Sequence, residues 1–193
     1  MLCFRIGIAL FVASCLHLAI GVHLQQQRPG CFLMLSNLQS GSNIGAICRN
    51  ALSFNVSEVV IVGRQNYKEK MRMADRGSKA RLVFRNFPSS QMGFDYLKYE
   101  KHCITIGVEI MPTATSIVDF KFKEGANVAF VFGNEGAGLS ELQRKNCDEF
   151  VYIPQYSVGM ASINVACCSA IVLQTFAVQA GYQQSEIIGE KFV

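Results

Sequence analysis

The feature that most constrains the fold is a series of short stretches that are apolar at almost every position. "CFLML" at residues 31–35 opens the series, and others follow at 59–62, 103–108, 128–132 and 150–153. A strand with one face in water alternates apolar and polar residues, so stretches of this kind indicate strands buried on both faces. Such strands are typical of parallel sheets that helices cover on both sides.

Segments with helical spacing separate these strands. In "NIGAICRNALSF" the apolar side chains of Ile44, Ile47 and Ala51 recur on one helical face, and Asn43 is a plausible N-cap. Further elements are expected as helices at 91–98, 139–146 and 162–180, the last ended by Gly181, and as a short strand at 82–84. We therefore predict an α/β fold with a mostly parallel sheet and helices on both faces, Rossmann-like in its layers.

Three of the predicted strands are followed by loops with unusual composition. The strands ending near Leu35, Phe132 and Ile153 lead into "SNLQSGSNIGAICR", "GNEGAGLS" and "PQYSVGMASINVACC". Ligands of parallel α/β sheets bind at the carboxyl ends of the strands. The three loops are therefore expected to meet at one binding site.

The middle loop nearly spells a phosphate-binding loop. In "VFGNEGAGLS" at residues 131–140, Gly133 and Gly138 have the spacing of G-x-x-x-x-G-K-[ST], with Ser140 at the end. Leu139 stands where that pattern requires lysine, whose ammonium would reach the terminal phosphates. The loop is therefore expected to serve a ligand without a polyphosphate.

Positive charge is concentrated in one segment. The chain of 193 residues has a net charge of only +4. Between residues 64 and 85 the basic side chains far outnumber Glu69 and Asp75; they are Arg64, Lys68, Lys70, Arg72, Arg76, Lys79, Arg81 and Arg85. A local basic stripe points to a polyanion such as RNA, and the alternative is a solvated loop and helix face.

The eight cysteines do not have the spacing of a disulfide framework or a zinc site. They lie at positions 3, 15, 31, 48, 103, 147, 167 and 168, without any C-x-x-C, and the three histidines do not cluster with them. Several fall within apolar runs, where buried free thiols are common. We interpret them as reduced thiols and expect no metal site.

The first part of the chain differs from the rest. Residues 2–22 are almost continuously apolar, with Arg5 near the start, and residues 25–29 are polar. The segment fits a signal peptide, a membrane anchor or a buried helix. We treat residues 1–29 as a targeting or anchoring appendage and 30–193 as the globular domain. Any membrane contact would come through residues 2–22, and targeting would lead to an organelle reached by the secretory route; otherwise the location would be cytoplasmic or nuclear.

Three motifs together carry a specific resemblance. "NIGAICRNA" (43–51), "VFGNEGAGLS" (131–140) and "IPQYSVGMASINVA" (153–166) resemble, in order, the motifs of the SpoU/TrmH family of RNA ribose methyltransferases, of the SPOUT class. The resemblance covers residues 31–181 and implies a trefoil knot in the C-terminal part of the fold. Gln155 and Ala166 depart from the usual pattern, in which methionine and serine stand at these positions.

The resemblance implies the cofactor S-adenosylmethionine and transfer of its methyl group to a ribose 2′-hydroxyl of tRNA or rRNA. It implies catalytic roles for Arg49, which follows Asn43 at the family's spacing, and orienting roles for Asn43 and Glu135. The residues implied in cofactor binding are Val108, Gly133, Asn134, Gly138, Ile153, Met160, Ser162, Ile163 and Asn164. The alternative is an RNA-binding or assembly protein that keeps this fold with little or no activity.

The helix expected at 162–180 indicates a partner. Ile163, Ile171, Leu173 and Val178 place apolar side chains on more than one of its faces. A helix of this kind must be covered on several sides. We therefore expect a homodimer, with the basic segment gripping RNA across two subunits.

Overall fold

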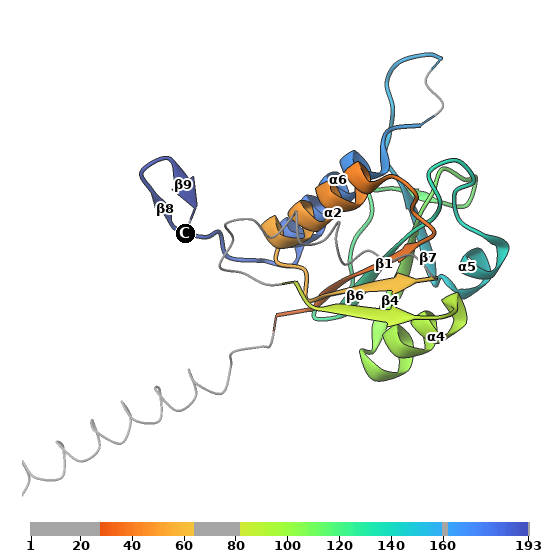
Figure 1. Cartoon of the computed structure of the whole chain (residues 1–193). Coiled ribbons are helices and arrows are strands. Elements are labelled where there is room, and N and C mark those ends of the chain that lie inside the picture. Colours follow the sequence, from red (N-terminus) through yellow and green to blue (C-terminus); the bar gives the residue numbers. More distant parts are fainter. Residues whose placement is uncertain (1–27, 64–81, 160–161, 193) are drawn as a thin grey trace, which may run out of the picture.

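The computed structural model describes residues 28–63, 82–159 and 162–192. Its centre is a seven-stranded sheet in the order β3-β2-β1-β6-β4-β7-β5, and every pair of neighbours is parallel (Figure 1). The strands are β1 (Cys31–Ser36), β2 (Glu58–Val62), β3 (Phe84–Phe87), β4 (Cys103–Val108), β5 (Thr115–Ser116), β6 (Asn127–Phe132) and β7 (Glu149–Tyr152).

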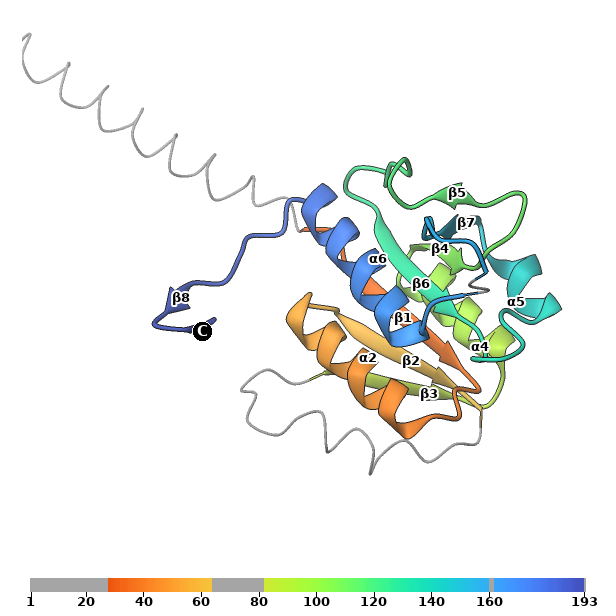
Figure 2. The same cartoon turned by 90° about the horizontal axis from the view of Figure 1, so that it is seen from above.

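Helices cover both faces of the sheet. α2 (Gly41–Ser53) and α6 (Val165–Gln179) lie side by side on one face (Figure 2). α4 (Ser90–Asp95), its π-helical continuation η1 (Tyr96–Glu100) and α5 (Glu141–Asn146) lie on the other. A small hairpin of β8 (Ile187–Ile188) and β9 (Lys191–Phe192) projects from the body near the C-terminus. The predicted α/β architecture with helices on both faces is confirmed.

The core consists of two apolar layers, one on each face of the sheet. β1 is buried along its whole length, with Leu33 and Leu35 in the layer under α2 and α6 and with Phe32 and Met34 in the opposite layer. Full burial of one such side chain stabilises a fold by about 1.5–3 kcal/mol. A strand of a sheet that is buried on both faces is therefore apolar at almost every position, as β1 is.

The outer strands differ most from expectation. We expected a strand at 82–84, but β3 begins only at Phe84. Its ladder with β2 runs from Val59↔Phe84 to Val62↔Phe87. The middle residues of β3, Arg85 and Asn86, are exposed and polar, so the apolar residues 82–84 did not indicate where the strand lies. The short strands β5, β8 and β9 were not expected from the sequence.

The helices begin at other residues than expected, and the caps of α2 and α6 show why. Asn43 as the N-cap of α2 was wrong: Ser40 is the cap, and its Oγ accepts the backbone N–H of Asn43 at 3.4 Å. α6 begins after Asn164 and not at Ser162, because the Asn164 side chain accepts the N–H of Ala166 at 2.8 Å. Both caps leave the preceding loop free to line the edge of the sheet.

The residues just before β1 are hydrogen-bonded to the rest of the fold. The N–H of Gly30 donates to Asn127 Oδ1 at 2.7 Å, and the Tyr182 hydroxyl donates to the Pro29 carbonyl at 2.6 Å. The apolar segment 2–22 lies outside the described residues. Within the part of the chain that is described, no helix is both long and apolar enough to cross a bilayer.

Candidate functional site

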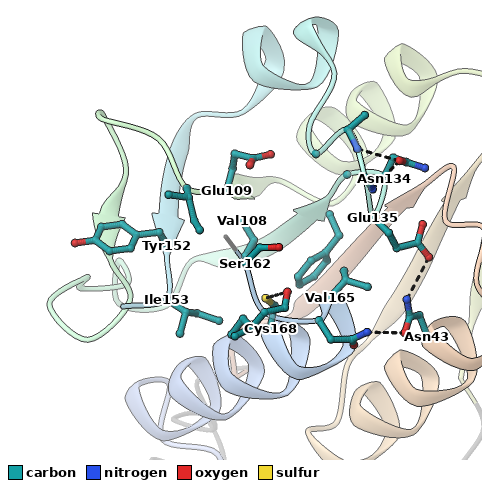
Figure 3. Close-up of a pocket in the computed structure, with 18 of the residues that line it drawn as sticks. Asn43, Val108, Glu109, Asn134, Glu135, Tyr152, Ile153, Ser162, Val165 and Cys168 are labelled. Carbon is teal, nitrogen blue, oxygen red and sulfur yellow. Dashed lines mark hydrogen bonds between the residues drawn. The ribbon is translucent and has the colours of Figure 1, made fainter. Parts of the chain in front are cut away.

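A pocket of about 720 Å³ opens at the carboxyl edge of the sheet, beside the ends of β4, β6 and β7 (Figure 3). Its walls come from segments far apart in sequence: the glycine turn after β6, the loops after β4 and β7, and the first turns of α2 and α6. Residues of all three sequence motifs therefore meet around one cavity.

The structure places nearly all the residues implied in cofactor binding along this pocket. They are Val108, Gly133, Asn134, Gly138, Ile153, Ser162, Ile163 and Asn164. Met160, also implied, lies outside the described residues. Asn43 and Glu135, implied in catalysis, line the pocket as well.

The glycine turn after β6 is closed on itself. Asn134 and Gly138 exchange two backbone hydrogen bonds, at 3.0 Å and 2.9 Å. A Cβ on Gly133 would overlap the backbone of Gly138 and Leu139, whereas a Cβ on Gly136 would meet only Asn134 Oδ1 at 3.6 Å. The family resemblance implies that Gly133 binds the cofactor; in the structure, what excludes a side chain at Gly133 is the close approach of the turn to itself.

A carboxylate anchors the far end of the same turn. Glu109 Oε2 accepts the N–H of Leu139 at 2.7 Å, and Gly138 lies directly against this carboxylate with φ +66°. A side chain at position 138 would meet both a left-handed backbone and the Glu109 oxygen. The Leu139 side chain is buried in the core. The position that would carry a phosphate-binding lysine thus faces inward.

A hydrogen-bonded chain of side chains joins the three motifs. Asn164 Nδ2 donates to Asn43 Oδ1 at 2.9 Å, and Asn43 Nδ2 donates to Glu135 Oε1 at 3.3 Å (Figure 3). Glu135 also accepts the backbone N–H groups of Gln39 and Ser40, at 3.1 Å and 3.0 Å. The arrangement fixes α2, the glycine turn and the start of α6 relative to one another.

These bonds keep Glu135 ionised. Partial burial acts to raise the pKa of its carboxyl, but the N–H groups of Gln39 and Ser40 and the Asn43 amide outweigh it, so the pKa lies below its ordinary value. An ionised carboxylate accepts hydrogen bonds and holds cations close. It is a poor proton donor at neutral pH, which suits an orienting role.

Arg49 is not brought to the pocket. α2 turns Ile44, Ile47 and Ala51 into the core, and Arg49 lies on the exposed side of the helix. It does not line the cavity, and it has no hydrogen bond or ion pair with another described residue. Its guanidinium is therefore available to a ligand that approaches from solvent.

The predicted RNA-binding residues are only partly described. Those from Arg64 to Arg81 lie outside the described residues. Arg85 lies near the start of β3, away from the pocket, and its Nε donates to Glu58 Oε2 at 3.4 Å. Its side chain is 54% exposed, so the ion pair leaves much of the guanidinium accessible.

Sequence reasoning missed several residues of the pocket. Glu109, Tyr152, Gln155 and Cys168 all line it. Glu109 carried a usable signal, since it directly follows an apolar strand, at the edge where ligands bind. Tyr152 and Cys168 carried no such signal, because each lies within an apolar segment, β7 or α6, that the sequence indicates only as part of the core.

Residues 30–174 match the model of the SpoU rRNA Methylase family. A curated relative, the 23S rRNA (guanosine-2'-O-)-methyltransferase RlmB of Blochmanniella floridana, is 28% identical over 158 residues, which cover 80% of this chain and 60% of the relative. The protein of the same name from Acinetobacter baylyi is 24% identical over 152 residues, which cover 78% of this chain and 60% of that relative. The chain thus spans about 60% of the length of these relatives.

The fold is also that of solved methyltransferases. The SpoU methyltransferase AviRb from Streptomyces viridochromogenes, in complex with the cofactor AdoMet, matches with a TM-score of 0.67 and 24% sequence identity. The match covers 81% of this chain and 60% of that chain. At this level of identity, the likeness shows a shared fold.

Proposed function

The chain belongs to the SpoU rRNA methylase family, and we propose that it transfers the methyl group of S-adenosylmethionine to a ribose 2′-hydroxyl of structured RNA, either tRNA or rRNA. The observation that carries the proposal is the hydrogen-bonded chain Asn164–Asn43–Glu135, which gathers the three family motifs around one pocket. The relatives named as rRNA 2′-O-methyltransferases support it.

The charges of the residues that line the pocket suit this cofactor. None of the described residues that line it is lysine or arginine, whereas Glu109 and Glu135 contribute carboxylates. S-Adenosylmethionine carries a sulfonium and an ammonium group and has no phosphate, so an electronegative pocket favours it over a nucleotide triphosphate. The volume of about 720 Å³ lies in the usual range for sites of this size of ligand.

The pocket also suits the cofactor in shape. At its glycines the turn exposes backbone groups to the pocket, and the side chains of Val108, Ile153 and Ile163 contribute an apolar part of its wall. Backbone donors and acceptors can recognise adenine and ribose edges, while the apolar residues cover their faces. We infer that these residues and Asn134 hold the cofactor.

Bound S-adenosylmethionine would supply the electrophilic methyl group. As the ribose oxygen bonds to the methyl carbon, the carbon–sulfur bond would break, and the hydroxyl proton would pass to the neighbouring RNA phosphate or to water. The protein then has to position the ribose hydroxyl and stabilise the charge that develops on its oxygen. Glu135 is ionised and Asn43 is fixed by two bonds, so this pair can orient the RNA without moving. We propose that Arg49, exposed on α2, binds the phosphate beside the target ribose and stabilises the developing charge. A guanidinium does not lose its proton readily, which argues for this electrostatic role over that of a base.

A homodimer is part of the proposal. α6 buries Val172, Leu173 and Phe176 against the sheet, but Ile171 and Val178 are 38% and 68% exposed. A second subunit would cover this apolar side and could bring its own basic segment to the RNA. The trefoil knot stays a prediction that follows from the family.

The experiment is transfer of a labelled methyl group from S-adenosylmethionine to total RNA, followed by mapping of resistant ribose positions after alkaline hydrolysis. We expect label in ribose 2′-O-methyl groups. Label in bases would overturn the reaction assigned. Tight RNA binding without any label would favour the alternative, an RNA-binding or assembly protein. Calorimetry with S-adenosylmethionine alone tests the cofactor site independently of the RNA.

A further inference from the structure

The cofactor pocket holds two carboxylates, and the protein uses them differently. Glu135 Oε1 accepts the Ser40 N–H at 3.0 Å and an N–H of Asn43 Nδ2 at 3.3 Å. Glu135 Oε2 accepts the Gln39 N–H at 3.1 Å. Both oxygens of Glu135 are therefore occupied by the protein itself. Glu109 has a hydrogen-bond donor on one oxygen only, so it keeps an acceptor for another group.

The second oxygen of Glu109 is both unpaired and accessible. Oε2 accepts the Leu139 N–H at 2.7 Å, whereas Oε1 makes no hydrogen bond with the described part of the chain. Oε1 is also not one of the buried polar atoms that lack a partner, and the Glu109 side chain is 21% exposed. Glu109 lines the cofactor pocket (Figure 3). A ligand in this pocket can therefore reach Oε1.

Contacts on two sides hold Glu109 in place. Its backbone N–H donates to the Val151 carbonyl at 3.0 Å, where β4 lies beside β7. Its Oε2 is bonded to the glycine turn, and Gly138 lies directly against the carboxylate. A group that is already ordered loses little conformational freedom when a ligand binds, so more of the energy of the contact contributes to affinity.

Within the described part of the chain, only a weak counterion faces this carboxylate. Arg144 Nη2 lies 4.0 Å from Glu109 Oε2, beyond hydrogen-bond distance, and the Arg144 side chain is 47% exposed. An ion pair this open to water contributes little. None of the described residues that line the pocket is lysine or arginine. The positive charge next to Oε1 is therefore left for a ligand to supply.

S-Adenosylmethionine has three groups that could face this oxygen. Its α-ammonium group has a full charge and three N–H donors, like the end of a lysine side chain. Its sulfonium has a charge but no N–H, and the amino group of its adenine has N–H donors but no charge. A hydrogen bond to a charged group is about twice as strong as a neutral one. The ammonium group therefore satisfies Oε1 best.

We propose that Glu109 Oε1 accepts a hydrogen bond from the α-ammonium group of S-adenosylmethionine, so that Glu109 selects ligands with an amino-acid end. This inference rests on the proposed function for the identity of the cofactor. S-Adenosylhomocysteine, the form left after methyl transfer, has the same ammonium group. The contact therefore stabilises both forms alike and acts on binding rather than on the methyl-transfer step. The two oxygens of one carboxylate hold the glycine turn and the cofactor together.

The first test measures the affinity of three ligands for Glu109→Gln in the full chain by calorimetry. Glutamine keeps an oxygen for the Leu139 N–H and removes the charge. The ligands are S-adenosylmethionine, S-adenosylhomocysteine and 5′-methylthioadenosine, which has the adenosine part and no amino-acid end. The first two should bind about tenfold to hundredfold more weakly than they bind the wild type, the scale of one lost hydrogen bond to a charged group. 5′-Methylthioadenosine should bind both proteins equally well.

Each of the other patterns overturns the inference. Unchanged affinity for all three ligands would show that Glu109 makes no contact with the cofactor. An equal loss for all three would limit Glu109 to the glycine turn or the adenine, and a loss for S-adenosylmethionine alone would assign it to the sulfonium. Glu141→Gln is the matched control, because it removes an 83% exposed carboxylate from α5, outside the pocket. It should leave all three affinities unchanged, which separates the contact from an effect of net charge.

A second test uses the wild type alone, so it does not depend on the folding of a variant. It compares S-adenosylhomocysteine with an analogue in which hydrogen replaces the amino group. The analogue should bind at least about tenfold more weakly, and equal affinity would overturn the inference. A wild type that binds none of these ligands would overturn the proposed cofactor and this inference with it. Labelled methyl transfer to RNA by the wild type reports on the proposed function independently of Glu109.

Discussion

The two edges of the sheet use polar residues in opposite ways. At the amino edge Glu58 is 8% exposed and accepts from the Tyr96 hydroxyl, from Lys101 Nζ at 2.6 Å and from Arg85 Nε at 3.4 Å. At the carboxyl edge Ser36 and Gln143 are as deeply buried and have unpaired atoms. The polar side chains of the cluster at the amino edge are thus paired with one another, whereas these two at the carboxyl edge are not.

A second cluster at the amino edge follows the same rule. Asp148 accepts from the Thr105 backbone and hydroxyl at 2.8 Å and 2.7 Å, and from Lys98 Nζ at 2.6 Å. Burial acts to raise the pKa of Asp148, but Lys98 and Thr105 together hold it below its ordinary value. The comparison teaches that polar residues at this edge are stability determinants, whereas those at the other edge are candidates for function.

The largest expected effect is that of Gly133→Ala, at the carboxyl edge. The added Cβ overlaps the backbone of Gly138, so the turn must open and the cofactor wall is lost. We expect S-adenosylmethionine affinity to fall by more than about a hundredfold, because several contacts are lost together. Gly136→Ala is the matched control, since its Cβ has space, and should bind normally. Calorimetry measures both; equal affinity in the two variants would contradict this account of the turn.

Next in size is Arg49→Ala. We expect normal cofactor binding and a loss of about a hundredfold or more in methyl transfer, the usual scale for removing one group that stabilises an oxyanion. Arg49→Lys should also fail, because a point charge does not reproduce the two parallel bonds of a guanidinium to phosphate. Lys145→Ala, on the exposed face of α5, is the control. Near-normal turnover in either Arg49 variant would move the chemistry to another residue.

At the amino edge, Glu58→Gln should act on stability alone. It weakens hydrogen bonds from two cations and should lower the free energy of unfolding by about 1.5–3 kcal/mol, with cofactor affinity unchanged. Reduced affinity for S-adenosylmethionine would show that the two edges are coupled.

The same variant gives a pH test. Burial opposes ionisation of Glu58, but Lys101, Tyr96 and Arg85 outweigh it and hold the pKa of its carboxyl below the ordinary 4.5. A lowered pKa in the folded state contributes stability that is fully present above the unfolded pKa and is lost as pH falls through the folded one. The stability difference between wild type and Glu58→Gln should thus be full at neutral pH and shrink below about pH 4.5. Chemical denaturation across this range measures it; a constant difference would exclude the ionic contribution.

The smallest expected effect is that of shortening the chain. A chain that begins at Arg28 keeps the Pro29 carbonyl for the Tyr182 hydroxyl and the contact of Arg28 with the Tyr182 ring. If residues before it are an appendage for targeting or anchoring, cofactor affinity and methyl transfer should be unchanged and solubility higher. A large fall in melting temperature with aggregation would show instead that residues 2–22 pack on the domain.

The sequence predicted the inner part of the fold well, for a physical reason. Continuous burial leaves a continuous apolar run, as in 31–35 and 128–132, and the run marks the strand. β5 was not found in this way and β3 was placed about two residues too early, because edge strands have one open side and do not need apolar residues. Helix starts such as Ser40 depend on which of several polar residues folds back on the backbone, and local sequence does not decide this.

The site was predictable where the family's motifs reach and not beyond. Gly133, Asn43 and Asn164 could be placed at one edge because each belongs to a motif that follows a strand. Glu109 and Gln143 belong to no motif. The sequence pointed to Glu109 only by its place directly after an apolar strand, and its bond to the Leu139 N–H, like the burial of Gln143, is visible only in the three-dimensional structure.

The pairing of β1 with β6 has a consequence for how the molecule folds. Gly30 and Asn127, bonded at the start of this ladder, are 97 residues apart, and Asn43 and Asn164 are 121 apart. Contacts this distant in sequence form slowly, because the intervening chain must be ordered first. The central strand β6 is inserted between β1 and β4, so a ribosome has to deliver most of the chain before the sheet can close. Until then the apolar strand β1 has no partner on the side that β6 will fill, and an open apolar strand edge of this kind favours aggregation of the nascent chain.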